Sequence, residues 1–344
     1  MNKKNNYLTV LSVISCVAVI YLHSNFVIWD NVYTSYFFTS NIIRSIFYFA
    51  VPVFFMITGA TLLDYNEKYS TKDFFVKRIK KTLIPFIIFS FFALFFKVIT
   101  CDIKIDDLNL LSIVNGILTT KFNDVYWYFI FLFKVYLIIP IFASLNKKIK
   151  NKILMYLAFI MFVFNIFIPF IIDLFNLNII NPIYIFGDNG YILYVICGYL
   201  FHNLSIDVKK IYLIYFCGFM CLLLMIIGGY YVSLHTGSFN ELFHNYLGLP
   251  CMIYSISIFI FCKYNCDIFY KFKNVNKLFL FLSKYTFSIY LVHMYIIHII
   301  VNFLKLDIYS IFYRTLFPFP VILISVVLIY LLRKIKFIRF VLPE

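Results

Sequence analysis

Apolar segments of about twenty residues recur along the whole chain, separated by short polar connections. An α-helix needs about 20 consecutive, predominantly apolar residues to cross the hydrocarbon core of a bilayer. Ten segments meet or approach that length, at 8–28, 41–63, 82–100, 124–144, 153–173, 189–203, 211–232, 247–263, 282–304 and 314–333. The sequence therefore predicts an all-α fold, a polytopic membrane bundle of ten transmembrane helices.

Composition supports this prediction and excludes other classes. Of the 344 residues, 63% are hydrophobic and 13% are charged, whereas an average soluble domain is about 45–50% apolar and about 25% charged. This balance excludes an ordinary soluble enzyme, a coiled coil and a disordered chain. No connection is long enough for a further globular domain, so we expect residues 1–344 to form a single membrane-embedded domain.

The Lys and Arg residues, which give a net charge of +15, are concentrated in alternate connections. Because Lys and Arg in short loops favour the cytoplasmic side, the pattern predicts that both termini are cytoplasmic. Lys3 and Lys4 begin the chain on that side, while Lys305 and Arg314 are among the few basic residues expected outside. We therefore attribute the basic charge to orientation in the cell membrane and expect no nucleic-acid partner.

Few ionisable side chains fall well inside the predicted spans, where they are costly and are functional candidates by default. They are His23, Arg44, Lys134, His293 and His298. His23 and Arg44 are expected at similar depth on consecutive helices, so the cation would keep the imidazole neutral and able to act as a general base. The alternative is a structural histidine bonded to a backbone carbonyl. Lys134 suggests a water-filled or anion-binding cavity.

The other histidines and the cysteines favour no metal site. His293 and His298 are five residues apart and so lie about 140° from each other around a helix, which disfavours a shared metal. His235 and His244 fall in an outer connection, where we expect them to be solvated. The eight Cys are scattered without a CxxC and are typical of small apolar helix residues.

A basic run precedes the third predicted span, on the side predicted to be cytoplasmic. It contains Lys77, Arg78, Lys80 and Lys81. Such a run orients the helix and attracts anionic lipid headgroups. It also suits the docking of a phosphorylated donor, because Arg and Lys pair with phosphates. Both interpretations can hold together.

Six segments resemble, in order, the motifs of the acyltransferase family 3 membrane proteins. They are LTVLSVISCVAVIYLHS, AVPVFFMITGATLL, FFVKRIKKTLIPF, VYWYFIFLFKVYLIIP, FGDNGYILYVICGYL and YTFSIYLVHMYIIH. The resemblance runs from about residue 7 to residue 335, and its nearest branch is the WecH-like O-acetyltransferases. The first segment ends in the His and small polar residue with which the family closes its first helix, here His23 and Ser24.

The resemblance implies a ten-helix enzyme that moves acetyl from cytoplasmic acetyl-CoA to a hydroxyl of a cell-envelope polysaccharide, glycolipid or similar lipid-linked acceptor. His23 would be catalytic, as a base or as a transient acyl-imidazole, and the basic run would bind the nucleotide of the donor. Candidates for contacts to substrate or to the oxyanion are Arg44, Lys134, Tyr126, Trp127, Tyr290, His293 and His298. No metal is implied.

Two positions depart from the family pattern. Ser12 stands eleven residues before His23, where the family usually has Arg, and Tyr48 stands four residues before Pro52, where many members have Arg. A different acyl donor or a non-catalytic partner is therefore compatible with the sequence. A transporter or flippase for an envelope glycan or a small polar substrate is the alternative from another class.

Overall fold

The computed structural model describes residues 6–179, 183–187 and 189–342; Lys3, Lys4 and Asp188 lie outside them. Within these ranges the chain forms α-helices, short 3-10 turns and π-helical segments, and no strand. The all-α class predicted from the sequence is therefore confirmed.

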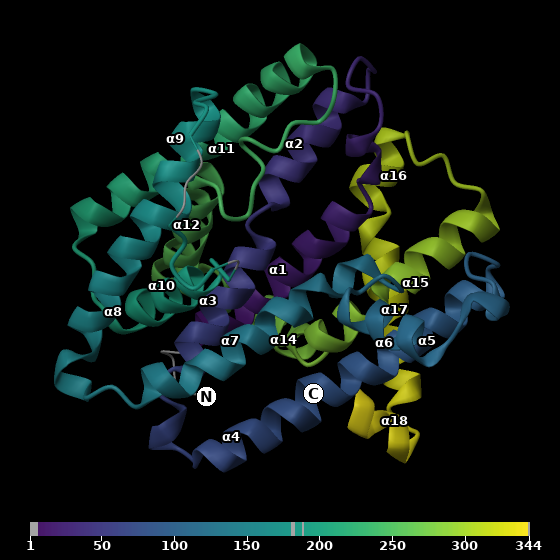
Figure 1. Ribbon diagram of the computed structural model, residues 1–344, viewed down its shortest axis with the longest axis horizontal. Helices are drawn as coiled ribbons and strands as arrows, with labels where there is room; N and C mark the ends of the chain where they lie inside the picture. Colours follow the sequence, from purple (N-terminus) through teal and green to yellow (C-terminus); the bar gives the residue numbers. More distant parts are fainter. Residues whose placement is uncertain (1–5, 180–182, 188, 343–344) are drawn as a thin grey trace. The chain divides into compact units, whose positions relative to one another are not determined.

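The helices follow one another along the chain with short connections (Figure 1). Their bounds are α1 (Asn6–His23), α2 (Phe37–Phe47), α3 (Ala50–Leu62), α4 (Thr71–Arg78), α5 (Ile84–Ile99), α6 (Leu110–Leu118), α7 (Trp127–Ala143), α8 (Lys147–Met161), α9 (Ile168–Leu174), α10 (Ile192–Asn203), α11 (Val208–Thr236), α12 (Leu249–Asn265), α13 (Asp267–Tyr270), α14 (Lys273–Ser283), α15 (Thr286–Leu304), α16 (Ile311–Leu316), α17 (Pro318–Leu332) and α18 (Lys336–Val341). The π-helical segments are Ile79–Leu83 and Phe162–Phe167.

Seven helical stretches in the described part of the chain are long and apolar enough to cross a membrane. They are Asn6–His23, Phe37–Glu67, Thr71–Ile99, Asp124–Ala143, Lys147–Leu174, Val208–Thr236 and Thr286–Leu304. Three shorter apolar helices, α10, α12 and α17, fall at the remaining predicted segments. The protein is thus an integral membrane protein by helix length and composition, while the count of ten spans and the cytoplasmic position of both termini stay predictions.

The first helix is shorter than the predicted span 8–28, because α1 ends at His23. The next two residues are polar, and the amide Nδ2 of Asn25 donates to the carbonyl of Ser40 at 2.8 Å. The chain then forms the 3-10 turn η2 (Phe26–Trp29). His23 is therefore the last helical residue, at the point where the chain turns.

Prolines interrupt two other predicted spans. Tyr48 lies between α2 and α3. Pro52 has no N–H that could donate to the Tyr48 carbonyl. The Cys251 thiol donates to this carbonyl instead, at 3.8 Å. The span 314–333 is likewise divided, since α16 ends before Phe317 and α17 begins at Pro318.

The described structure divides into two compact units, each of which is treated by itself. The larger unit contains residues 1–62 and 146–329, and the smaller unit contains 63–145 and 330–344. The expectation of one membrane domain over 1–344 stays a prediction.

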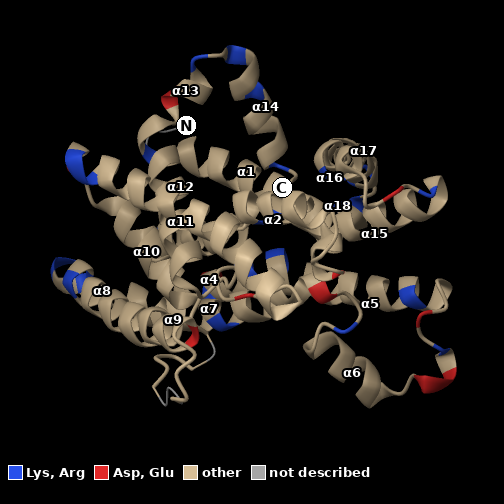
Figure 2. Cartoon of the chain, turned by 90° about the horizontal axis from the view of Figure 1, so that it is seen from above, with Lys and Arg blue, Asp and Glu red and all other residues tan. Residues whose placement is uncertain are grey.

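The larger unit is built on α3, which packs against α10 and α1, while α11 packs against α12. A Cβ on Gly59 would lie 1.8 Å from the carbonyl oxygen of Val195, and one on Gly198 would lie 2.0 Å from that of Met56. These two glycines let the backbones of α3 and α10 approach closely, as small residues do between membrane helices. The basic residues of α8 and α11 lie near the starts of these helices (Figure 2).

The smaller unit contains α4, α5, α6, α7 and α18 and has an aromatic core. Phe86 of α5 lies with its ring centroid 5.4 Å from those of Phe129 and Phe133 on α7. The side-chain amide of Asn66 donates to the carbonyl of Ala143 at 2.7 Å. This bond joins the end of α7 to the segment before α4. This unit carries the basic run.

Candidate active site

His23 and His293 form a hydrogen-bonded pair in the larger unit. Nδ1 of His23, at the end of α1, lies 2.7 Å from Nε2 of His293 on α15. The rings are stacked, with centroids 5.0 Å apart and planes 9° from parallel. His293 is fully buried. The sequence nominated both residues separately but gave no reason to expect them in contact.

The backbone of α15 decides which nitrogens of the pair carry protons. Nδ1 of His293 lies 2.8 Å from the carbonyl oxygen of Tyr290 and 3.2 Å from that of Ile289. A carbonyl oxygen only accepts, so Nδ1 of a neutral His293 carries the proton and its Nε2 presents a lone pair. That lone pair accepts the proton on Nδ1 of His23. Nε2 of neutral His23 is consequently the proton acceptor of the pair.

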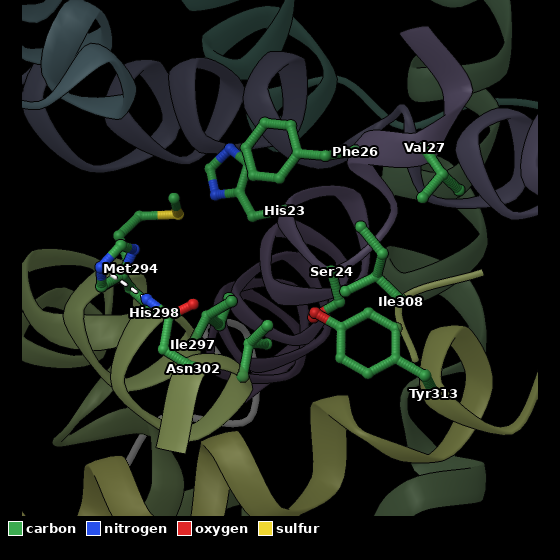
Figure 3. Close-up of a pocket in the computed structure, with 11 residues that line it drawn as sticks. His23, Ser24, Phe26, Val27, Met294, Ile297, His298, Asn302, Ile308 and Tyr313 are labelled. Carbon is green, nitrogen blue, oxygen red and sulfur yellow. Dashed lines mark hydrogen bonds between the residues drawn. The ribbon is translucent and has the colours of Figure 1, made fainter. Parts of the chain in front are cut away.

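A cavity of about 190 Å³ lies beside His23 (Figure 3). It is mostly apolar, and its polar lining comes from His23, Ser24, His298, Asn302 and Tyr313. Water occupies about 30 Å³ per molecule in the liquid, so the cavity has room for a small acyl group or part of a sugar. Figure 3 shows the His23 ring lying between Phe26 and Met294.

Ser24 is a candidate that reasoning from charge cost missed. Its side chain is 2% exposed, and its hydroxyl oxygen is buried without a hydrogen-bond partner among the described residues. A buried polar group normally has a partner, so this unpartnered hydroxyl, on a residue of the cavity wall, is a candidate to contact a ligand. The signal for it was the small polar residue that follows the histidine in the first motif.

Arg44, on α2, is held by aromatic rings. Its guanidinium carbon lies 4.8 Å from the ring centroid of Trp29, and 4.9 Å from those of Tyr48 and Phe239. Trp29 belongs to η2, the turn whose Phe26 stacks on His23. His23 and Arg44 thus each contact a ring of the same turn.

The expectation that His244 is solvated is wrong, because its side chain is fully buried. The Ser45 hydroxyl donates to the carbonyl of Asn41 at 2.7 Å and lies 2.8 Å from Nε2 of His244, which therefore donates to it. Burial, and then the nearby charge of Arg44, hold the pKa of His244 well below 6.5. Gly229 of α11 makes room for the ring, since a Cβ there would lie 2.5 Å from Cε1 of His244.

Arg314, the first residue of the last predicted span, is also buried. It is 1% exposed and donates to the hydroxyls of Thr39 at 2.8 Å and Ser40 at 2.7 Å. It also donates to the carbonyls of Tyr36 and Tyr309, each at 3.3 Å. These contacts join α16 to the start of α2 and give Arg314 a structural role.

The other predicted residues divide between the two units, and Tyr290 and His298 belong to the same helix as His293. The carbonyl of Tyr290 bonds to His293, and exposed His298 accepts from Nδ2 of Asn302 at 2.8 Å at the cavity wall. Tyr126, Trp127 and Lys134 belong to the smaller unit. There Tyr126 is 1% exposed, and Nζ of Lys134 lies 4.9 Å from the ring centroid of Phe131.

The basic run spans the end of α4 and the π-helical segment that follows it. Lys77, Lys80 and Lys81 are exposed. Arg78 is half-buried between the rings of Phe74 and Tyr136, and its Nε is buried without a partner among the described residues. Arg78 also lines an apolar cavity of about 290 Å³ with Phe75, Ile79, Leu83, Phe133, Tyr136 and Leu137. An arginine donor and an apolar cavity therefore adjoin within the smaller unit.

The described residues contain no group of three or more His, Cys, Asp or Glu arranged to hold a metal ion. Two arrangements of described residues are suited to chemistry: the histidine pair with its cavity, and the basic run with its cavity.

Comparison with known proteins identifies the family. A family model described as an acyltransferase domain matches residues 5–334, nearly the whole chain. The searches of curated proteins and of solved structures return no significant match. With apolar helices along its length and this match across it, the chain belongs to acyltransferase family 3 and is a membrane acyltransferase.

Proposed function

We propose that this protein is an O-acetyltransferase of the cell membrane. It would move acetyl from cytoplasmic acetyl-CoA to a hydroxyl of a cell-envelope polysaccharide, a glycolipid or a similar acceptor. The observation that carries this proposal is the hydrogen bond between His23 and His293, which leaves Nε2 of His23 as a proton acceptor beside a cavity.

In the proposed reaction, Nε2 of His23 takes the proton of the acceptor hydroxyl while the hydroxyl oxygen attacks the thioester carbon. The tetrahedral intermediate then expels the CoA sulfur, which takes the same proton from His23. The products are an acetyl ester and the CoA thiol. General-base catalysis of this kind contributes about 10²–10⁴-fold to the rate.

His293 would assist by position and by electrostatics. When His23 is protonated, the lone pair on Nε2 of His293 still accepts the proton on Nδ1 of His23. This resembles the aspartate of a Ser-His-Asp triad, which orients the base and stabilises the imidazolium. A neutral imidazole does so less strongly than a carboxylate.

The Ser24 hydroxyl is a candidate for stabilising the oxyanion of the intermediate. It is buried, unpartnered among the described residues and in the wall of the same cavity as His23. A preorganised donor directed at developing negative charge contributes roughly 10²–10³-fold to the rate.

Donor binding is proposed for the basic run of the smaller unit. Exposed Lys77, Lys80 and Lys81 would pair with the phosphates of the CoA nucleotide, as would Arg78. The apolar cavity beside Arg78 suits the uncharged arm of the donor.

The test is transfer of label from acetyl-CoA to envelope glycans and lipids in membranes containing the wild type, His23→Ala or His235→Ala. His235 is an exposed histidine and serves as the matched control. We expect transfer to fall about 10²–10⁴-fold in His23→Ala and to persist in His235→Ala. Equal transfer by wild type and His23→Ala would contradict the proposal. If neither transfers label at equal expression, transport or a non-catalytic role becomes the better account.

A further inference from the structure

The aromatic cage of Arg44, formed by Trp29, Tyr48 and Phe239, leaves the donors of the guanidinium unused. Nε of Arg44 is buried without a hydrogen-bond partner, and the described residues supply the side chain with neither a hydrogen bond nor an ion pair. A guanidinium carries five N–H donors. The rings hold its charge through cation–π attraction, and the described structure gives these N–H donors no oxygen or nitrogen acceptor. The cage therefore stabilises the cation and keeps its donors available.

The cage adjoins the His23 site through the 3-10 turn η2. Phe26 stacks on His23, with ring centroids 5.9 Å apart and planes 6° from parallel. Trp29, three residues on, faces Arg44. Side chains at i and i+3 of a 3-10 helix eclipse each other, so Phe26 and Trp29 lie on one side of the turn. The two rings are 48% and 49% exposed, so a ligand can reach both.

Among the described residues, no acidic side chain pairs with the guanidinium. Glu241, in the connection that also carries Phe239, is exposed and makes no ion pair with Arg44 in the described structure. His244 contacts the rings of Tyr48 and Phe239 but donates its Nε2 proton to Ser45. The described residues thus leave the donors of the guanidinium without an acceptor.

We propose that Arg44 binds an oxyanion of the acceptor, a carboxylate or phosphate on the sugar whose hydroxyl is presented to His23. The planar guanidinium pairs with two oxygens of such a group through parallel hydrogen bonds, and the exposed faces of Phe26 and Trp29 provide apolar surface for the sugar. This inference rests on the proposed function, because it takes the bound molecule to be the acceptor of the acetyl group. It places that acceptor, rather than the donor, beside η2.

The chain supplies its own reporter for a binding test. It contains two tryptophans, Trp29 and Trp127. A Trp127→Phe variant leaves Trp29, in ring contact with Arg44, as the single indole. We would titrate this full-length protein in a non-ionic detergent with glucuronate, glucose 6-phosphate, glucose and a short-chain phosphatidylglycerol, and follow the Trp29 emission.

We expect a saturable change with the anionic sugars in the millimolar range and none with glucose; the preferred sugar tells carboxylate from phosphate. In the same background, Arg44→Gln should abolish the change, and the matched Arg339→Gln at an exposed site of α18 should keep it. Arg44→Lys retains the charge without the planar fork and should weaken binding about tenfold, which keeps the test decisive if Arg44→Gln misfolds.

Three outcomes would overturn the inference: no saturable response to either anionic sugar, an equal response in correctly folded Arg44→Gln, or a response to the phospholipid alone. Binding is measured without turnover, and His23→Ala should retain it. Failure of this inference is therefore distinguishable from failure of the acyl-transfer proposal.

Discussion

Oγ of Ser12 lies 3.2 Å from Oγ1 of Thr286, the first residue of α15. The same two helices meet again where His23 bonds to His293. Ser12 is one of the two positions that depart from the pattern of arginines that the family resemblance implies. Its hydroxyl contact joins α1 to α15 at one end, and the histidine pair joins them at the other.

Removal of this contact should affect stability first. We expect Ser12→Ala to lower the free energy of unfolding by about 0.5–1.5 kcal/mol, the net contribution of a typical hydrogen bond. Chemical denaturation in detergent measures the change. A large loss of acetyl transfer at unchanged stability would show instead that Ser12 takes part in donor handling.

His293 should be replaceable in part by a side chain that still accepts a hydrogen bond. His293→Ala removes the partner of Nδ1 of His23, whereas His293→Gln keeps an oxygen acceptor on α15. We expect kcat to fall in both, more steeply in His293→Ala, with the KM for acetyl-CoA little changed. Steady-state kinetics on purified protein measures kcat and KM separately. Equal kcat values in the two variants would argue against the positioning role.

Ser24→Ala should lower kcat by about 10²–10³-fold if the hydroxyl stabilises the oxyanion. Ser144→Ala, at an exposed position after α7, is the matched control and should behave as wild type. Thermal unfolding should be similar for both variants, because the Ser24 hydroxyl has no partner to lose among the described residues. Full transfer by Ser24→Ala would remove this residue from the mechanism.

His244 makes the fold sensitive to acid. Its pKa lies well below 6.5 in the folded protein, so below about pH 6.5 the unfolded chain binds a proton that the folded one does not. Stability is therefore complete above that pH and falls as pH decreases toward the folded pKa, by up to about 1.4 kcal/mol per unit.

The measurement is the free energy of unfolding at about pH 7.5 and about pH 5.5 for wild type, His244→Gln and His235→Gln. The His244 variant should lose less stability on acidification than wild type, and the variant at exposed His235 should match wild type. An identical pH dependence in all three proteins would mean that His244 is not held neutral.

Gly59 tests the packing of the larger unit. A Cβ at this position would lie 1.8 Å from the carbonyl oxygen of Val195, so Gly59→Ala forces α3 and α10 apart. We expect a loss of about 1–3 kcal/mol or more, as for other overpacked sites. Thr61→Ala, on an exposed position of α3, should cost far less in the same denaturation assay. Similar stabilities would contradict the close approach.

The helical class and the positions of the apolar segments were predictable because twenty-residue apolar runs have few alternatives. The breaks within them were less so. At the break after His23, the Asn25 side-chain amide donates to the carbonyl of Ser40. At the break between α2 and α3, the Cys251 thiol donates to the Tyr48 carbonyl, to which Pro52 has no N–H to donate. Both are contacts between elements, which periodicity does not encode.

The site shows the same contrast between what the sequence pattern predicts and what contacts between elements decide. His23 and Arg44 stood out because a titratable group in a span is costly. The contact of His23 with His293 joins residues 270 positions apart, and no local pattern carries it. His244 was misplaced because its connection folds back onto α2 and α11, where Gly229 leaves room for the ring.

The turn Phe26–Trp29 has a consequence for regioselectivity. It fixes the spacing between the imidazole that Phe26 stacks on and the guanidinium that Trp29 faces. A sugar anchored by its charged substituent would offer His23 only the hydroxyl that matches this spacing. The length of one short turn would then select which carbon of the ring bears the ester.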